Sequence, residues 1–140
     1  MIRGKYLTSL DDITPVLDLR QAVLGQGRDG FDRMAVYALA LDQQGCPAGA
    51  GRLYIDGDDQ FRLDALAVLP QRRRQGLGDL MVRMLLQRAL DLNAPAVVLD
   101  APQDLVPFFS RYGFSPRLEG GMAATPQSID ACGGCSGKCR

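Results

Sequence analysis

Histidine is absent from the 140-residue sequence, and glutamate occurs once, as Glu119. Without histidine the chain lacks the most common general base, the Ser-His and Cys-His nucleophile pairs, and every imidazole metal ligand. Any proton transfer must therefore use aspartate, Glu119, tyrosine, cysteine or water.

An excess of charge is also absent, and so are long apolar runs. Sixteen basic residues balance sixteen acidic residues, so no net charge attracts the protein to nucleic acid or to an anionic membrane. No apolar run approaches the ~18 residues of a membrane-spanning helix, and the N-terminal MIRGKYLTSLDD lacks the apolar region of a signal peptide. We therefore expect a cytoplasmic protein that binds neither nucleic acid nor membrane.

Cysteine is scarce outside the C-terminal end. Cys46 is internal, whereas Cys132, Cys135 and Cys139 follow one another closely near the end of the chain, which is not the spacing of a disulfide framework. Three thiols fall one ligand short of a closed tetrahedral zinc site, so Cys46, a second chain or an exogenous ligand would have to complete it. Three interpretations stay open: a zinc or iron–sulfur site, a reactive redox pair, or an end with neither role.

The pattern of apolar residues predicts alternating strands and helices within one domain, as the length of the chain favours. A strand end and a helix come first, and the helix stops near Gly25 and Gly27. Three apolar runs separated by short polar turns then predict an antiparallel meander of strands over residues 34–42, 47–55 and 61–69.

The second half of the chain continues this alternation. Apolar residues at helical spacing predict the most regular helix over residues 76–92, and a buried strand follows over 96–101. A short helix closed by Gly113 and a last strand complete the pattern. Periodicity then becomes weak, so we predict a domain over residues 1–119 and a Gly/Cys-rich tail over 120–140.

Residues 70–81, PQRRRQGLGDLM, join the third strand of the meander to the long helix. Glycine costs about 1 kcal/mol relative to alanine inside a helix, yet Gly76 and Gly78 open the most regular helix of the chain. A dinucleotide fingerprint would need a third glycine at Met81 and is disfavoured. A P-loop is excluded because no Lys-Ser/Thr follows the second glycine.

Two interpretations of this joint remain, a solvated arginine-rich turn and an anion site. A helix N-terminus offers unpaired backbone N–H groups and the positive end of the helix dipole, and glycines leave these groups free of Cβ atoms. Arg72, Arg73 and Arg74 add positive charge. We therefore predict a phosphate or pyrophosphate site at residues 73–79.

Two motifs in the expected order resemble a known family. The segment from Val68 to Gly78, V-x-P-x-x-R-x-x-G-x-G, is similar to the acyl-CoA binding motif of the GNAT N-acetyltransferase superfamily. Its R/Q-x-x-G-x-G/A core begins at Arg73. Downstream, FFSRYGF over residues 108–114 is similar to the F-Y-x-x-x-G-F segment of the family. The order of elements fits from about residue 34 to 116.

The resemblance implies an α/β (α+β) fold with a mixed, mostly antiparallel central sheet of six to seven strands and about four flanking helices. Two central strands would splay apart to hold the acyl-CoA. The implied activity is transfer of an acetyl group from acetyl-CoA to a primary amine of a small molecule or peptide, by direct attack on the thioester. The acceptor is not identified by any motif, and a homodimer is left open.

The resemblance also implies which residues bind acetyl-CoA. Backbone amides of the motif would hold the pyrophosphate, and the strand before it would pair with the pantetheine and polarise the thioester carbonyl. The implied cofactor-binding residues are Leu66, Ala67, Val68, Arg73, Arg74, Gln75, Gly76, Leu77, Gly78, Asp79, Gln103 and Phe109.

Two residues are candidates for catalysis. Many family members use a carboxylate on the strand before the motif as the general base, and Asp64 lies in that strand. The period of two places Arg62, Asp64, Leu66 and Val68 on one face. The alternative for Asp64 is a structural ion pair with Arg62 or with the arginine cluster.

The general acid is less clear, because Phe109 stands where the family often has tyrosine. Tyr112 lies about one helical turn further on and is the candidate acid, and its alternative is a packing residue before Gly113. A thiol with a pKa near 8.5 leaves tolerably well without an acid. A second interpretation of the whole chain is therefore a catalytically weak acyl-CoA-binding module with a metal- or redox-sensing tail.

Overall fold

The computed structural model describes residues 2–134, with side chains as far as Ala131. Within this part of the chain the elements are β1 Arg3–Thr8, α1 Thr14–Leu24, β2 Val36–Leu41, β3 Pro47–Ile55, β4 Phe61–Val68, α2 Leu77–Asp91, β5 Val97–Leu99, α3 Val106–Ser110, β6 Ser115–Pro116, β7 Met122–Ala124 and α4 Pro126–Gly134. Among the helices described, none is long and apolar enough to cross a membrane.

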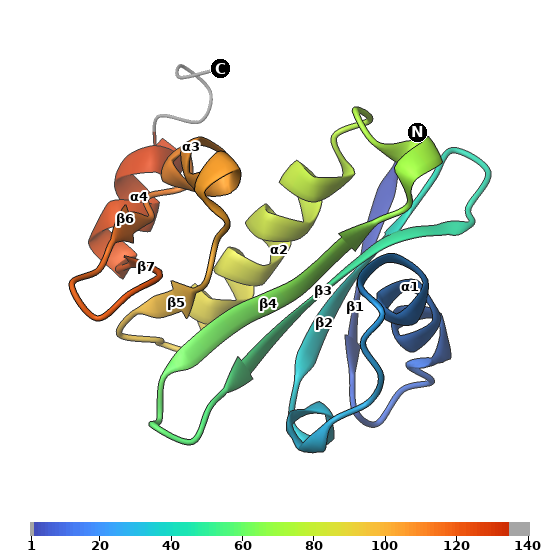
Figure 1. The fold of residues 1–140 in the computed structure, drawn as a ribbon, viewed down its shortest axis with the longest axis horizontal. Coiled ribbons are helices and arrows are strands. Elements are labelled where there is room, and N and C mark those ends of the chain that lie inside the picture. Colours follow the sequence, from blue (N-terminus) through green and yellow to red (C-terminus); the bar gives the residue numbers. More distant parts are fainter. Residues whose placement is uncertain (1, 135–140) are drawn as a thin grey trace.

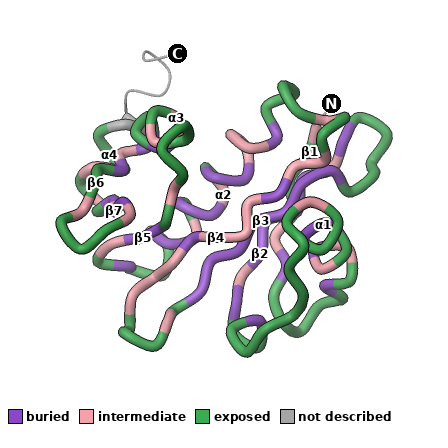
Figure 2. The backbone as a smooth tube through the Cα atoms, viewed as in Figure 1, coloured by how far each residue is buried: buried purple, intermediate pink, exposed green. Residues whose placement is uncertain are grey.

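The strands form one sheet in the order β1-β2-β3-β4-β5-β7-β6. The β4–β5 pair is parallel and the other neighbouring pairs are antiparallel. Helices α1 and α2 cover opposite faces of the sheet (Figure 1). Val16 and Leu19 of α1 belong to one apolar cluster, and Met81 and Leu85 of α2 belong to another. The buried residues of β2 and β3 lie between these two layers (Figure 2).

Strands β4 and β5 are joined over a short distance. Phe61 pairs with Val97 and Arg62 pairs with Val98, and no further pair follows in the described residues. Beyond Arg62 the two strands diverge (Figure 1). The rest of β4 therefore has β3 on one side and backbone groups available to a ligand on the other. The mixed, mostly antiparallel sheet with splayed central strands confirms the fold class that the sequence predicted.

A β-bulge interrupts β4 at Ala65, which adopts a left-handed φ of 53°. Before it Asp64 pairs with Arg52, and after it Ala67 pairs with Ala50. Strand β4 thus carries one residue more than β3 across this segment.

The bulge reverses the alternation of side chains in β4. Asp64 and its partner Arg52 lie on the side of the sheet that α1 covers, where the β3 neighbours of Arg52 belong to the α1 cluster. Leu66 and Val68 instead pack against the α2 cluster. The prediction that Arg62, Asp64, Leu66 and Val68 share one face is therefore wrong beyond Asp64, because one extra residue shifts the period.

The chain continues as an ordered part of the fold after Glu119. Strand β7 pairs with β5 on one side and with β6 on the other, and Ile129 of α4 is buried in the α2 cluster. A Cβ at Gly121 would lie 2.5 Å from the carbonyl oxygen of Leu99. The boundary predicted between residues 119 and 120 is therefore wrong for the segment up to Gly134. The glycines that suggested a separate tail instead allow a tight turn and a close backbone contact.

Candidate active site

The start of α2 presents a run of free backbone amides. Arg74 and Gly76 both adopt left-handed backbone conformations, with φ of 67° and 80°. Within residues 2–134, the N–H groups from Arg74 to Asp79 have no hydrogen-bond partner, and the first amide that is paired is that of Leu80, 3.0 Å from the Gly76 oxygen. Consecutive free amides at a helix N-terminus form a concave site for an anion.

The three arginines beside this loop differ in what they contact. Arg72 donates from Nε to Oδ2 of the buried Asp42 at 3.0 Å. The backbone N–H of Cys46 and the Arg72 guanidinium lower the pKa of Asp42. Arg73 and Arg74 are exposed and form no ion pair with any described residue. Arg72 is therefore structural, and the other two are available to a bound anion.

The second motif packs directly against the first turn of α2. The hydroxyl of Tyr112 donates to Oδ1 of Asp79, which also accepts from Arg83 Nε at 3.0 Å. Burial, together with this donation, raises the pKa of Tyr112 to about 12. A proton held at that pKa transfers unfavourably to a thiolate whose acid has a pKa near 8.5. The hydrogen bond gives Tyr112 a role in joining α3 to α2, and its role as general acid stays a prediction.

Two residues of the predicted site, Phe109 and Gln103, and the neighbouring Phe108 have different surroundings. Phe109 is buried and meets Phe114 edge to face at 5.9 Å between ring centroids. Gln103 is exposed in the 3₁₀ turn Gln103–Leu105. Phe108, which sequence reasoning did not assign, is half-buried, with a ring carbon 3.8 Å from where a Cβ of Gly78 would lie. Its place beside Phe109 in the motif was the available signal.

Asp64 lies in the splayed part of β4 and forms a bidentate ion pair with Arg52. Arg52 Nε donates to Oδ1 and Nη2 donates to Oδ2, both at 2.8 Å. The structural alternative to the base role was an ion pair with Arg62 or with the arginine cluster, but Arg62 donates to Asp56 at 3.1 Å. Counting outward in equal steps from the turn between β3 and β4 pairs residue 52 with residue 64, so the hairpin register was the signal for Arg52.

The Arg52 side chain continues into a buried network with the segment between α1 and β2. Its Nη1 donates to Asp29 Oδ1 at 2.7 Å and to Asp32 Oδ1 at 3.2 Å. Arg20 also donates to Asp32, from Nη1 to Oδ2 at 3.0 Å and from Nη2 to Oδ1 at 2.9 Å. The Tyr37 hydroxyl donates to Asp32 Oδ1 at 2.6 Å. Burial raises the pKa of Asp32, but these hydrogen bonds outweigh it and lower the pKa well below the usual range.

A metal site is not formed by the described residues. No group of three or more Cys, Asp or Glu side chains in this part of the chain is arranged to hold an ion. The side chain of Cys132 and all of Cys135 and Cys139 lie outside the described residues. The zinc or iron–sulfur hypothesis for these three cysteines stays a prediction.

A shallow groove of about 460 Å³ lies where α1 meets the ends of β3 and β4. Asp12, Asp18 and Leu19 line one part of it, and Pro47 and Leu69 line another. None of these residues belongs to the site that the sequence predicted.

An open mixed sheet whose central strands diverge beside a helix start lined with free amides defines the class of acyl-CoA-dependent acyltransferases. The chain belongs to the acetyltransferase (GNAT) family, whose model matches residues 10–114.

Individual relatives agree with this assignment. The chain is 32% identical over 68 residues to the uncharacterized N-acetyltransferase YjcF of Bacillus subtilis (strain 168), covering 49% of this chain and 48% of YjcF. The match spans about half the length of that relative. An acyl-CoA N-acyltransferase from Pseudomonas aeruginosa has a TM-score of 0.78 over 89% of this chain and 100% of that chain, at 22% identity. Escherichia coli ElaA has a TM-score of 0.75 over 89% and 99%, at 21% identity. These two structures show the shared fold.

Proposed function

We propose that this chain transfers an acetyl group from acetyl-CoA to a primary amine. The observation that carries the proposal is the run of free amides from Arg74 to Asp79, which follows the end of the part of β4 that β5 leaves unpaired. A pyrophosphate supplies the negative charge that these amides favour, and Arg73 and Arg74 add cations beside it.

The splayed strand supports the position proposed for the rest of the substrate. From Leu66 to Val68, β4 has no strand partner on the β5 side among the described residues. Its outward backbone groups would pair with the amide groups of pantetheine. Gln103 and Phe109 would contact the cofactor, and so would Phe108, which lies against Gly78.

The proposed reaction is direct. The amine nitrogen attacks the thioester carbonyl, a C–N bond forms, the C–S bond breaks, and the amine proton passes to Asp64 through water. Arg52 uses one lone pair on each Asp64 oxygen, so the partly exposed carboxylate keeps acceptor capacity. A backbone amide of β4 would stabilise the developing oxyanion, and the thiolate leaves as a group with a pKa near 8.5 in its acid form.

Thiol release from acetyl-CoA across a panel of primary amines tests this function. We expect binding of acetyl-CoA in the micromolar-to-millimolar range typical of enzymes, and release above the rate of hydrolysis with at least one amine. Binding without amine-dependent release would contradict acetyl transfer. No described residue supports the alternative of a sensing module. The cytoplasmic location and the homodimer stay predictions.

Substitution of Gly76 with alanine tests the anion site. Alanine at φ +80° costs roughly 1–2 kcal/mol, and relief of this strain rotates neighbouring amides away from a common centre. We expect the Kd of acetyl-CoA, measured by calorimetry, to rise about ten-fold, which corresponds to about 1.4 kcal/mol.

The matched control is Gly25→Ala. Gly25 also has a left-handed φ, of 67°, at the C-terminus of α1, and nothing lies within 4 Å of its Cβ position. It should lose similar stability and keep the Kd of the unmodified protein. Equal weakening in both variants would show that the amides at Gly76 hold no phosphate.

The role of Tyr112 is tested by Tyr112→Phe. A hydrogen bond to a charged acceptor contributes about 1.5–3 kcal/mol to stability, so we expect a lower unfolding midpoint. Because the raised pKa keeps the proton on the phenol, kcat should change by less than about three-fold across the pH profile. A general acid would instead contribute about a hundred-fold or more, and a loss of that size would establish Tyr112 as the acid.

A further inference from the structure

The segment between α1 and β2 is held to the sheet by buried ion pairs as well as by apolar contacts. Phe31 and Met34 are 43% and 88% exposed, whereas Asp32 is 1% exposed. Gly25 and Gly27 provide no side chain to pack. The ion pairs of Asp29 and Asp32 therefore fix this segment against Arg20 and Arg52, in addition to the packing of Phe31 on Tyr54.

Arg52 makes those contacts and also holds Asp64. All three of its guanidinium nitrogens donate to carboxylates: Nε and Nη2 to Asp64, and Nη1 to Asp29 and Asp32. Arg52 is itself buried, and its guanidinium stacks 4.4 Å from the ring centroid of Tyr54. One fixed side chain therefore determines the spacing between the proposed base on β4 and the α1–β2 segment.

The part of the network that reaches solvent is negative. Three carboxylates against two guanidinium groups leave one net negative charge on Arg20, Asp29, Asp32, Arg52 and Asp64. Both arginines are buried, whereas the side chains of Asp29 and Asp64 are 46% and 33% exposed. The hydrogen bond from Arg52 lowers the pKa of Asp29, so this carboxylate is ionised at neutral pH.

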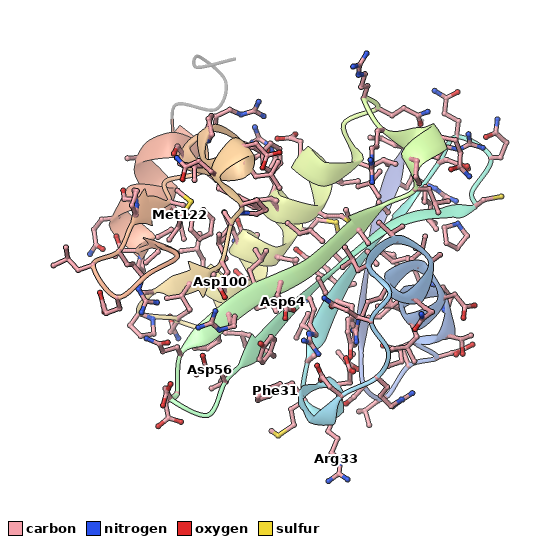
Figure 3. The ribbon with its side chains drawn as sticks, viewed as in Figure 1. Phe31, Arg33, Asp56, Asp64, Asp100 and Met122 are labelled. Carbon is pink, nitrogen blue, oxygen red and sulfur yellow. The ribbon has the colours of Figure 1, made fainter. Side chains whose placement is uncertain are left out.

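The aromatic side chains beside the network belong to the same surface. Phe31 packs on Tyr54 with 4.6 Å between ring centroids. Figure 3 shows Phe31 below Asp64 on the near side of the sheet, where α1 also lies. Carboxylates next to an exposed aromatic ring favour an alkylammonium group and disfavour an anion.

We propose that Arg52 is a positioning residue that holds Asp29 and Asp64 side by side at the acceptor end of the site, and that the acceptor is a cationic amine without an anionic group. The inference rests on the proposed acetyl transfer. Asp64 directly precedes the bulge, and Leu66 begins the stretch proposed to bind the thioester. An ammonium held by Asp64 and Asp29 would therefore approach that stretch from the α1 face.

Arg52→Lys tests the positioning role because it keeps the charge and removes the planar fork that reaches several carboxylates at once. The two acceptor probes are 1,5-diaminopentane and 5-aminopentanoate, in which a carboxylate replaces one terminal CH2–NH3+ group. For the unmodified protein we expect kcat/KM to be about ten-fold or more higher for the diamine, as expected for one favourable charge contact. In Arg52→Lys the KM of the diamine should rise about ten-fold, with the KM of acetyl-CoA unchanged.

Two further variants separate positioning from folding. Arg62→Lys is the matched control, because Arg62 also lies on a central strand and donates to two carboxylates, Asp56 and Asp100. It should lose less stability, because Arg62 and its partner Asp100 are more exposed than Arg52, and it should keep the KM of the diamine. Asp29→Asn leaves the Arg52–Asp64 pair in place and should reduce the preference for the diamine. An equal KM in all three variants, or a preference for 5-aminopentanoate, would overturn the proposal.

Hydrogen exchange of residues 25–34 makes the test independent of turnover. The diamine should slow exchange of these amides in the unmodified protein and not in Arg52→Lys, and 5-aminopentanoate should have no effect in either. If neither probe is acetylated and the diamine still protects the segment, acetyl transfer to it fails while the site stands. If acetyl transfer occurs and the diamine gives no protection, the acceptor inference fails while the function stands.

Discussion

Replacing Asp64 with asparagine is expected to lower kcat about a hundred-fold or more, the usual contribution of a general base. Asparagine has nearly the shape of aspartate and cannot take up the amine proton at neutral pH. The substitution does not alter the backbone amides at the start of α2 that are proposed to bind acetyl-CoA. The KM of acetyl-CoA should therefore stay within about two-fold of the value for the unmodified protein. Initial rates of thiol release with the best amine of the panel give both constants.

The pH profile distinguishes a lost base from a disturbed fold. An alkylammonium group has a pKa near 10.4, so a base is needed most at neutral pH and least as the free amine becomes abundant. The defect of Asp64→Asn should therefore shrink as the pH rises toward 10. Asp56→Asn, which removes a carboxylate from the Arg62 pair in the same hairpin, should show no such trend. A defect that is constant with pH would exclude Asp64 as the base.

Asp32→Asn is expected to lower the free energy of unfolding by about 3–5 kcal/mol, the range for breaking a buried ion pair by removing one partner. Asparagine can still accept from the Tyr37 hydroxyl, but Arg20, which is 2% exposed, loses its counter-charge. Urea unfolding followed by circular dichroism measures the loss. Asp29→Asn is the control, because the half-exposed Asp29 should contribute about 1 kcal/mol or less.

Asp32→Asn should also change how the free energy of unfolding depends on pH in the acid range. The pKa of Asp32 is lowered in the folded state, so the unfolded chain binds the proton more readily. Its contribution is complete above the unfolded pKa of about 3.9 and is lost as the pH falls from there toward the folded pKa. Stability of the unmodified protein should therefore fall below about pH 4, and that of Asp32→Asn should fall less. If the stability of both proteins fell in parallel below pH 4, Asp32 would have the same pKa in the folded and unfolded states.

Much of the fold follows from local patterns in the sequence. The helix predicted over residues 76–92 is α2, Leu77–Asp91, and the strand predicted over 47–55 is β3 with the same bounds. These segments combine one clear period with glycine or acidic turns at their ends, and such signals depend on neighbouring residues alone. Strand β7, with three residues, was missed because it is too short to show a period.

The acyl-CoA half of the candidate site was also within reach of the sequence. Gly76 and Gly78 mark a helix start that must stay open, and this is a local requirement of the backbone. The acceptor half of the site could not be predicted from the sequence. Arg20, Asp32 and Arg52 come together only when α1, the segment after it and β3 pack against one another. Sequence reasoning named Asp64 without its partner, since charge pairing across strands depends on register.

The sequence by itself thus determined the order of elements, the amide-lined turn at Gly76 and the family, because each rests on short-range spacing. Tertiary structure alone decided which face Leu66 and Val68 occupy relative to Asp64. A single left-handed residue, Ala65, inserts one extra position into β4 and turns Leu66 away from Asp64. Alanine carries no local preference for that conformation. The pairing of β4 with β3 beyond the bulge accommodates it, and Leu66 and Val68 therefore face α2 while Asp64 faces α1 beside Arg52.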